Sequence, residues 1–120
     1  MISVMGKINK YITLIFSALL LALSSFALEI PKKPNQLVND YANVLSKAQA
    51  NEIEQKLIQY DSETSTQIAV VTIKSLKGDD LFDYSQRLAE SWGIGGGEND
   101  NGVLLLISID DRKIRIHTGL

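Results

Sequence analysis

Two runs of apolar residues constrain the fold of this chain more than any other feature of its sequence. Residues 67–73 and 103–109 are apolar or β-branched at nearly every position, which indicates strands that are covered on both faces. The helix predicted between them, over residues 79–91, begins after Asp79 or Asp80, and Gly93 follows it. Four large side chains recur along one side of this helix: Leu81, Tyr84, Leu88 and Trp92. A strand, a helix and a strand in this order predict a βαβ unit with parallel strands and a right-handed crossover.

Residues 113–118 add a further strand to this unit. Their side chains alternate, with Ile114 and Ile116 on one face, and the polar residues 110–112 before them predict a tight turn. This strand should pair antiparallel with the strand before it. We therefore predict an α/β fold: an α/β/α sandwich whose small mixed sheet of three strands is built around a βαβ unit plus an antiparallel hairpin strand.

A second helix is predicted before the first of these strands. Ser46 and Gln49 have the spacing of a capping box, in which each side chain bonds the backbone amide of the other residue. Apolar residues at helical spacing follow as far as Tyr60, and a polar run begins at Asp61, where we expect the helix to end. The segment before it, residues 36–45, is expected to be irregular or to form a brief strand.

Residues 1–27 have the parts of a secretory signal peptide. Two lysines precede the apolar run 11–23, and Ser25 and Ala27 stand at the −3 and −1 positions of a cleavage site. The alternative is a membrane-spanning anchor, which needs about 20 apolar residues, whereas this run has 13. No Cys follows the site, which excludes a lipoprotein anchor. We expect cleavage after Ala27 and export to the periplasm or the extracellular space.

The remaining 93 residues, 28–120, can form one modest core. The two prolines within residues 28–36 predict a linker. Two of the 12 basic residues lie in residues 1–27, which leaves 10 basic against 14 acidic residues and a net charge of −4. This balance argues against a nucleic-acid partner. The absence of Cys excludes thiol catalysis, disulfides, zinc–thiolate sites and iron–sulfur clusters.

The glycine-rich stretch 93–102 is the most unusual part of the chain. It joins a helix end to a strand start, so it matches neither the Walker loop nor the dinucleotide fingerprint. Its four consecutive polar residues offer oxygen ligands of the kind that calcium prefers: Glu98, Asn99, Asp100 and Asn101. The alternative is a solvated loop that turns at Asn101 and Gly102. Composition alone favours the solvated loop.

Few residues suit nucleophilic catalysis. The chain has one histidine, His117, on the polar face of the last predicted strand, and no Gly-x-Ser-x-Gly pattern. A solvated or packed histidine is the simpler interpretation. We therefore predict no catalytic residue from the sequence.

An ordered set of short motifs resembles the TPM domain of YgcG-like extracytoplasmic proteins. The resemblance extends from residue 37 to residue 120. The matching motifs are Asn39–Ser46, Gln67–Thr72, Trp92–Gly95, Asp100–Leu106, Arg112–Ile116 and Thr118–Leu120. In this family the pattern continues with a Glu and closing helices. We therefore expect residues 37–120 to be a TPM-like domain that is incomplete at its C-terminus.

The resemblance implies an α/β/α sandwich outside the cytoplasm with a hard-metal site, usually discussed as calcium. It points to three metal ligands: Asp40, Asp100 and Asn101. We expect Asp40 to converge with Asp100 and Asn101 at one edge of the sheet. Many relatives carry a later transmembrane helix, so the full-length protein is expected to have a C-terminal membrane span.

The family supports two kinds of function. The first is a calcium-binding interaction or accessory module whose partner is an unknown envelope or membrane protein. The alternative is a metal-dependent acid phosphatase that acts on phosphomonoesters. A phosphatase needs a nucleophile or a metal-bound water beside a cluster of cations, and the only basic cluster, Arg112, Lys113 and Arg115, lies across a strand from the glycine-rich loop. We favour the first function.

Overall fold

The computed structural model of the chain describes residues 9–15, 27–95 and 101–118. Residues 9–15 are helical and their side chains are exposed. Most of the predicted signal peptide and half of the glycine-rich stretch therefore lie outside the described residues. Among the helices that are described, none has the length and apolar content that a bilayer crossing requires.

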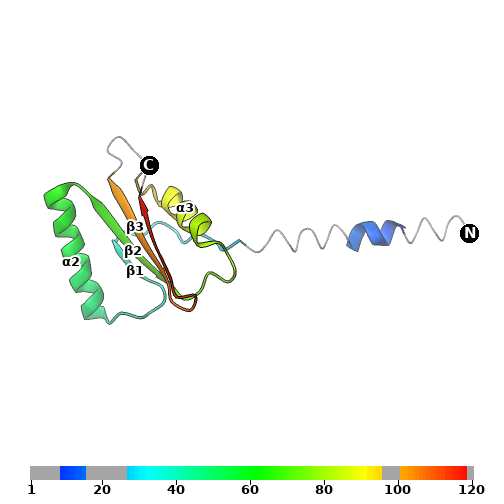
Figure 1. Cartoon of the computed structure of the whole chain (residues 1–120), viewed down its shortest axis with the longest axis horizontal. Helices are drawn as coiled ribbons and strands as arrows, with labels where there is room; N and C mark the ends of the chain where they lie inside the picture. Colours follow the sequence, from blue (N-terminus) through cyan, green and yellow to red (C-terminus); the bar gives the residue numbers. More distant parts are fainter. Residues whose placement is uncertain (1–8, 16–26, 96–100, 119–120) are drawn as a thin grey trace, which may run out of the picture.

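The folded body is a four-stranded mixed sheet with a helix on each side (Figure 1). The elements follow the chain in the order β1 (Val38–Asp40), α2 (Lys47–Thr64), β2 (Gln67–Ile73), α3 (Leu81–Trp92), β3 (Gly102–Ser108) and β4 (Lys113–Thr118). The strands lie in the order β1-β2-β3-β4. β1 and β3 are parallel to β2, and β4 is antiparallel to β3. The predicted α/β fold, the parallel pair and the antiparallel hairpin strand are confirmed.

β1 is the strand that the three-stranded prediction omitted. It has only three residues, of which Asn39 and Asp40 seldom occur in strands. It pairs with β2 from Val38 opposite Val70 to Asp40 opposite Thr72. The brief strand was therefore the correct alternative for residues 36–45, and the sheet has four strands rather than three.

Local hydrogen bonds define the ends of α2 (Lys47–Thr64). The Gln49 amide donates to Ser46 Oγ at 3.1 Å, and the Ser46 amide donates to Gln49 Oε1 at 2.9 Å, which is the predicted capping box. The helix continues about one turn past the expected end, because the Asp61 carbonyl accepts from the amide of Ser65 at 2.8 Å. Ser65 adopts a left-handed conformation with φ 60° and ends the helix.

α3 (Leu81–Trp92) has the predicted caps. The Asp83 amide donates to the carboxylate of Asp80 at 2.9 Å, so Asp80 rather than Asp79 is the N-cap. Gly93 follows the last turn with φ 69°, and its amide bonds the carbonyls of Ala89 and Glu90. A glycine suits this position because left-handed backbone costs it little.

The core lies between the sheet and α3. Alternate residues of β2 and β3 face this helix, and Val71, Leu104 and Leu106 are 0% exposed. The helix contributes its predicted stripe, of which Tyr84, Leu88 and Trp92 are buried. We call this side of the sheet the closed face.

The opposite side of the sheet is covered only in part. α2 packs against β1 and β2 rather than over β3 and β4, and none of its residues is buried. On β4, Ile114 and Ile116 lie on this side, opposite Ile107 and Leu105, and each is 65% exposed. We call the part of this side formed by Val103, Leu105, Ile107, Ile114 and Ile116 the open face.

Candidate functional site

Asp40 ends β1 at the carboxyl end of the strand, where it holds the turn toward α2. Its Oδ1 accepts from the Thr72 hydroxyl at 2.6 Å and from the Val44 amide at 3.1 Å. Its Oδ2 accepts from the amide of Leu45 at 2.8 Å. The Asp40 carbonyl accepts from the amide of Asn43, which has φ 56°. The motif that suggested a metal ligand therefore has a structural role in this turn.

The same hydrogen bonds set the charge state of Asp40. Desolvation by burial acts to raise the pKa of the carboxyl. The bonds from the Thr72 hydroxyl and from the Leu45 and Val44 amides act the other way, and together they hold the pKa below its ordinary value of 3.8. Asp40 is therefore ionised at neutral pH, and both of its oxygens already accept hydrogen bonds.

The strand register separates Asp40 from the predicted metal loop. Asp40 lies beside Thr72, near the carboxyl end of β2, whereas Gly102 lies beside Gln67 at its amino end. Gln67 and Thr72 are five residues apart along β2, which corresponds to about 16 Å. Asn101 precedes Gly102, and its carbonyl accepts from the Gln67 amide at 3.0 Å. The expected convergence of Asp40 with Asn101 is therefore wrong.

The third predicted ligand, Asp100, lies outside the described residues. Within residues 9–15, 27–95 and 101–118, no three side chains of the His, Cys, Asp and Glu types gather closely enough to hold a metal ion. Asp40 and Asn101 do not fit a shared calcium site, because they lie at opposite ends of the sheet. Asp40 instead has a local structural role in the turn that follows β1.

Gly102 also has a structural explanation. A side-chain Cβ at this position would lie 2.2 Å from the backbone nitrogen of Gly95 and 2.9 Å from Cγ2 of Ile94. The chain that leaves α3 therefore passes directly against the first residue of β3. Only glycine leaves room for this approach, so Gly102 is required by packing whether or not the loop binds an ion.

The basic cluster does not approach the glycine-rich loop. Arg112 lies in the turn between β3 and β4, and Lys113 pairs with Ser108 at the carboxyl end of β3. Asn101 lies at the other end of that strand, about 20 Å away. The Arg115 guanidinium packs over the Phe82 ring at 4.2 Å from its centroid. These residues do not form a phosphate site with Asn101.

His117 lies on β4 opposite Leu104, on the side of the sheet that faces α3. Its Nδ1 is buried without a hydrogen-bond partner among the described atoms. The Ser108 hydroxyl donates to Asp111 Oδ2 at 2.7 Å. Because Ser108 lies at the far end of β3, Ser108 and His117 do not form a catalytic pair.

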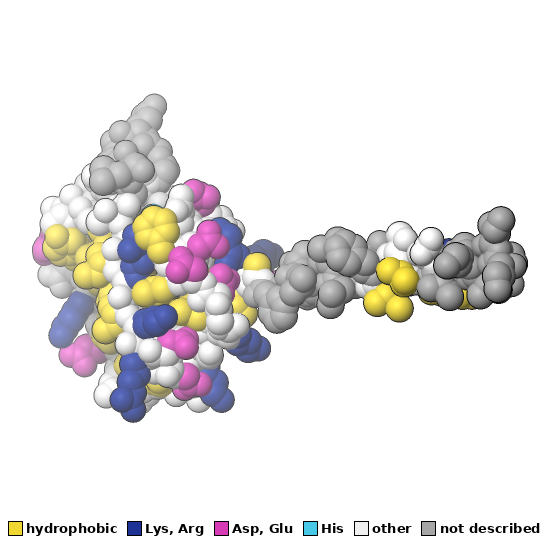
Figure 2. Space-filling view, turned by 45° about the vertical axis from the view of Figure 1, so that its right-hand side comes forward, with side chains coloured by type: hydrophobic (Ala, Val, Ile, Leu, Met, Phe, Trp, Pro, Cys, Tyr) yellow, Lys and Arg dark blue, Asp and Glu magenta, His cyan; other side chains and the backbone are white. Residues whose placement is uncertain are grey.

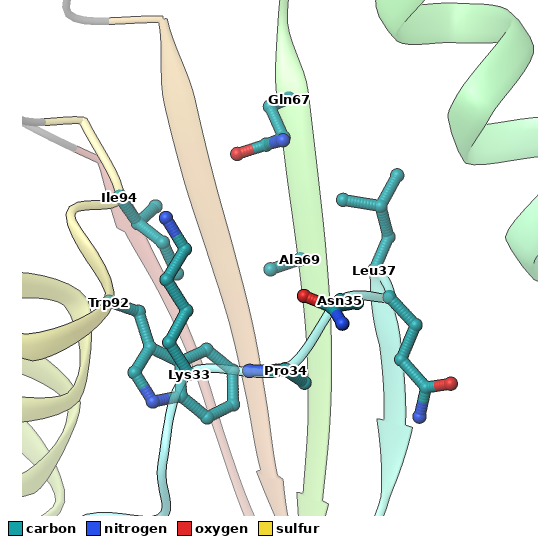
Figure 3. Close-up of a pocket in the computed structure, with 9 residues that line it drawn as sticks. Lys33, Pro34, Asn35, Leu37, Gln67, Ala69, Trp92 and Ile94 are labelled. Carbon is teal, nitrogen blue, oxygen red and sulfur yellow. The ribbon is translucent and has the colours of Figure 1, made fainter.

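A cavity of about 240 Å³, which the sequence did not predict, lies at the amino ends of β1 and β2 (Figure 3). Figure 3 shows the Lys33 side chain extending past the Trp92 indole toward Ile94. The Gln67 side-chain amide also lines the cavity. The Trp92 indole nitrogen donates to the carbonyl of Pro31 at 2.8 Å. Lys33 was assigned only to a linker and Trp92 to the core, so no sequence signal marked this cavity.

A second cavity, of about 370 Å³, separates α2 from β1. Asp40, Lys47 and Glu54 line it. The Glu54 carboxylate accepts from the backbone amides of Leu37, at 2.9 Å, and Val38, at 2.6 Å. Glu54 therefore holds the start of the edge strand, as Asp40 holds its end.

Comparison with known proteins identifies the relatives of this chain. A protein from Naja oxiana named L-amino-acid oxidase is 32% identical over 77 residues, which are 64% of this chain and 77% of that protein. The N-terminal domain of a P. gingivalis protein, determined by NMR in solution, is 34% identical with a TM-score of 0.67. That similarity covers 77% of this chain and 65% of the solved chain, so the present chain spans about two thirds of that structure's length.

The family assignment comes from the TPM domain, which matches residues 38–120. The match begins at the first residue of β1 and includes both helices and all four strands. It therefore covers the complete sheet described above. The chain belongs to the TPM domain family.

Proposed function

We propose that this chain is an exported, non-enzymatic TPM domain that binds an apolar partner surface at the cell envelope through the open face. The observation that carries the proposal is the exposure of Ile114 and Ile116, 65% each, beside the partly buried Leu105 and Ile107. Adjacent apolar side chains left in water on one side of a sheet are typical of an interaction surface. A partner that covers them gains the free energy of removing this area from water.

The distribution of charge supports a protein partner rather than a nucleic acid. Figure 2 shows one side of the body, on which Lys and Arg side chains are interspersed with Asp and Glu. A surface that binds nucleic acid needs a continuous basic patch or stripe. The net negative charge of the predicted mature chain is also unfavourable for contact with phosphates.

Site-specific photocrosslinking in the cell envelope tests this function. A crosslinking residue at position 116 should give one discrete product with an envelope protein. The matched control is position 113, which lies on the opposite side of the same strand. Equal products from both positions, no product from position 116, or a crosslink from position 116 to the closing helices expected after residue 120 would contradict binding of a partner through the open face.

Export is tested by the N-terminus of the protein in cells. Mass spectrometry of the periplasmic or extracellular form should find Leu28 as the first residue. A cytoplasmic protein that retains Met1 would overturn this part of the proposal.

The same purified protein should not hydrolyse a phosphomonoester. Turnover that requires a metal ion would favour the phosphatase alternative instead.

The calcium prediction continues as a proposal for Asp100 and Asn101 without Asp40. At about a hundredfold excess of calcium over its dissociation constant, binding would stabilise the folded chain by about 2.7 kcal/mol. Thermal unfolding with calcium and with a chelator measures this shift. We expect Asp100→Ala to abolish it and Asp40→Asn to retain it. An unchanged midpoint in the parent protein would remove calcium from the proposal.

The name of the Naja oxiana relative adds no function to this proposal. An oxidase that binds a dinucleotide cofactor on a Rossmann fold uses a Gly-x-Gly-x-x-Gly turn between a strand and a helix. No such spacing of glycines occurs in this chain. We therefore do not propose oxidation of amino acids.

A further inference from the structure

The predicted cleavage site and the first anchored residue of the fold coincide. The sequence pattern places cleavage between Ala27 and Leu28. Among the described residues, Leu28 is also the first that hydrogen bonds to the folded body: its amide donates to Asp79 Oδ2 at 3.2 Å. Its carbonyl accepts from the Arg87 guanidinium at 3.0 Å. These two observations are independent, since one comes from the pattern of residues 7–27 and the other from contacts made by residue 28.

Further contacts hold the segment that follows. Leu28 and Ile30 pack against the core, and the Trp92 indole donates to the Pro31 carbonyl at 2.8 Å. Residues 28–31 are thereby attached to the start and the end of α3. A new chain terminus at Leu28 would be held at the Asp79 carboxylate by contacts on both sides of its backbone.

The charges around Leu28 favour a positive group there. Asp79 pairs with Arg87, whose guanidinium also contacts Asp83 at 3.1 Å. Asp79, Asp83 and Arg87 together carry a charge of −1, and the Asp80 carboxylate lies next to Asp79. The Asp79 side chain is only 10% exposed, so a counter-charge at this carboxylate is screened less than one on the open surface.

We propose that hydrolysis of the peptide bond between Ala27 and Leu28 creates an α-ammonium group that pairs with the Asp79 carboxylate and fixes the mature N-terminus to the domain. The inference rests on the proposed export. A signal peptidase adds one water across the bond: Ala27 leaves with a carboxylate, and the Leu28 amine takes up a proton at neutral pH. The neutral amide donor at 3.2 Å is then replaced by a charged one, and the cluster of Asp79, Asp83 and Arg87 becomes electrically neutral.

The pairing has a definite pH dependence. An adjacent carboxylate favours the charged amine, so the pKa of the Leu28 α-amino group rises above its ordinary value of about 7.7–8.0. The stabilisation is complete below the pKa of the unfolded chain and is lost as the pH rises through the higher pKa of the folded chain. The neighbouring charges are the Arg87 guanidinium, which stays protonated in this range, and the carboxylates of Asp83 and Asp80. The nearby Tyr84 has a raised pKa and titrates later still.

The test uses the chain that begins at Leu28, released from an N-terminal fusion by a protease that leaves no added residue. This chain contains the whole core and all four strands. Its partner sample is the same chain with an acetylated α-amine, which keeps an N–H donor but carries no charge. At pH 6 we expect the free amine to raise the unfolding midpoint by on the order of 4 °C. The difference should disappear above about pH 10.

Asp79→Asn should abolish the difference between the free and acetylated chains. The control Asp110→Asn, in the exposed turn after β3, should retain it. If Asp79→Asn does not fold, NMR titration of the parent through the Leu28 carbonyl carbon still decides the question. An α-amino pKa at its ordinary value, with equal midpoints for free and acetylated chains, would overturn the ion pair.

Failure of export is distinguishable from failure of the ion pair, because the titration uses protein cleaved in vitro. An exported form that begins at a residue other than Leu28 would overturn the maturation role even if the in vitro ion pair forms. An exported form that begins at Leu28 together with an unshifted α-amino pKa would retain export and reject the pairing.

Discussion

The two sides of the sheet differ in how much of their apolar surface is covered. On the closed face, Val71, Leu104 and Leu106 are fully buried under α3. On the open face, Ile114 and Ile116 are each 65% exposed, although they belong to the same sheet and are equally apolar. An apolar pattern in the sequence therefore identifies a surface that favours burial. It does not identify which segment or partner covers that surface.

The cause lies in the two helices. α3 presents a continuous apolar stripe that includes Tyr84, Leu88 and Trp92, and all three are buried. α2 has no buried residue and packs only against β1 and β2. Its residue Glu54 and its N-cap Ser46 accept hydrogen bonds from backbone amides. One helix therefore supplies the core, while the other supports the edge strand.

The largest expected difference between the two faces comes from neighbouring leucines. Leu104→Ala on the closed face should lower the free energy of unfolding by about 3–4 kcal/mol, because it leaves a cavity among fully buried side chains. Leu105→Ala on the open face is the matched control and should cost about 1 kcal/mol, since Leu105 is only half buried. Urea unfolding measures both. Equal losses would show that both faces are equally packed.

A smaller effect is expected at the turn that closes the edge of the sheet. Asp40→Ala removes the acceptor of the Thr72 hydroxyl and of the Val44 and Leu45 amides. We expect a loss of about 2 kcal/mol, the usual scale for hydrogen bonds to a charged group. Asp110→Ala, an exposed carboxylate in another turn, should change stability by less than about 0.5 kcal/mol. Similar losses in both variants would contradict the structural role of Asp40.

Acid should weaken the hydrogen bonds that the Asp40, Asp79 and Asp111 carboxylates accept before it affects the apolar core. The pKa values of Asp40, Asp79 and Asp111 all lie below the ordinary 3.8. A lowered folded-state pKa means that the stabilisation is complete above the unfolded pKa and is lost as the pH falls through the folded value. Unfolding free energies from pH 7 to pH 2 should therefore fall below about pH 4. A flat profile through this range would contradict the lowered pKa values.

The smallest effect on stability is expected on the open face. Replacing Ile114 and Ile116 together by Thr should change the free energy of unfolding by less than about 1 kcal/mol, because both side chains are already exposed. In the chain that carries the crosslinking residue at position 116, Ile114→Thr alone should weaken the crosslinked envelope product proposed above. A large loss of stability would mean that the two side chains are packed in the free protein.

Most of the fold could be predicted from local sequence. β2 and β4 have the predicted bounds, β3 begins and ends one residue earlier than predicted, and the caps at Ser46 and Gly93 are present. These features depend on nearby residues or on periodicity. β1 could not be predicted in the same way, because Asn and Asp seldom occur in strands. This strand forms by pairing with β2, and Glu54 holds its start through the amides of Leu37 and Val38.

The candidate site was predicted less well than the fold. Asp40 and Asn101 both occur in recognisable motifs, yet each has a local structural explanation, one as a turn acceptor and the other beside the obligatory Gly102. Motif spacing along the chain does not determine which end of a parallel sheet a residue occupies. That depends on strand direction and register, which placed the two residues at opposite ends.

The most direct test of the difference between the two faces is the solvent accessibility of individual methyl groups. A soluble paramagnetic agent increases the NMR relaxation of methyl protons that it can approach. We predict strong relaxation of the Ile114 and Ile116 methyl groups and weak relaxation of those of Val71, Leu104 and Leu106. Protection of Ile114 and Ile116 to the level of Leu104 in the free protein would contradict the open face.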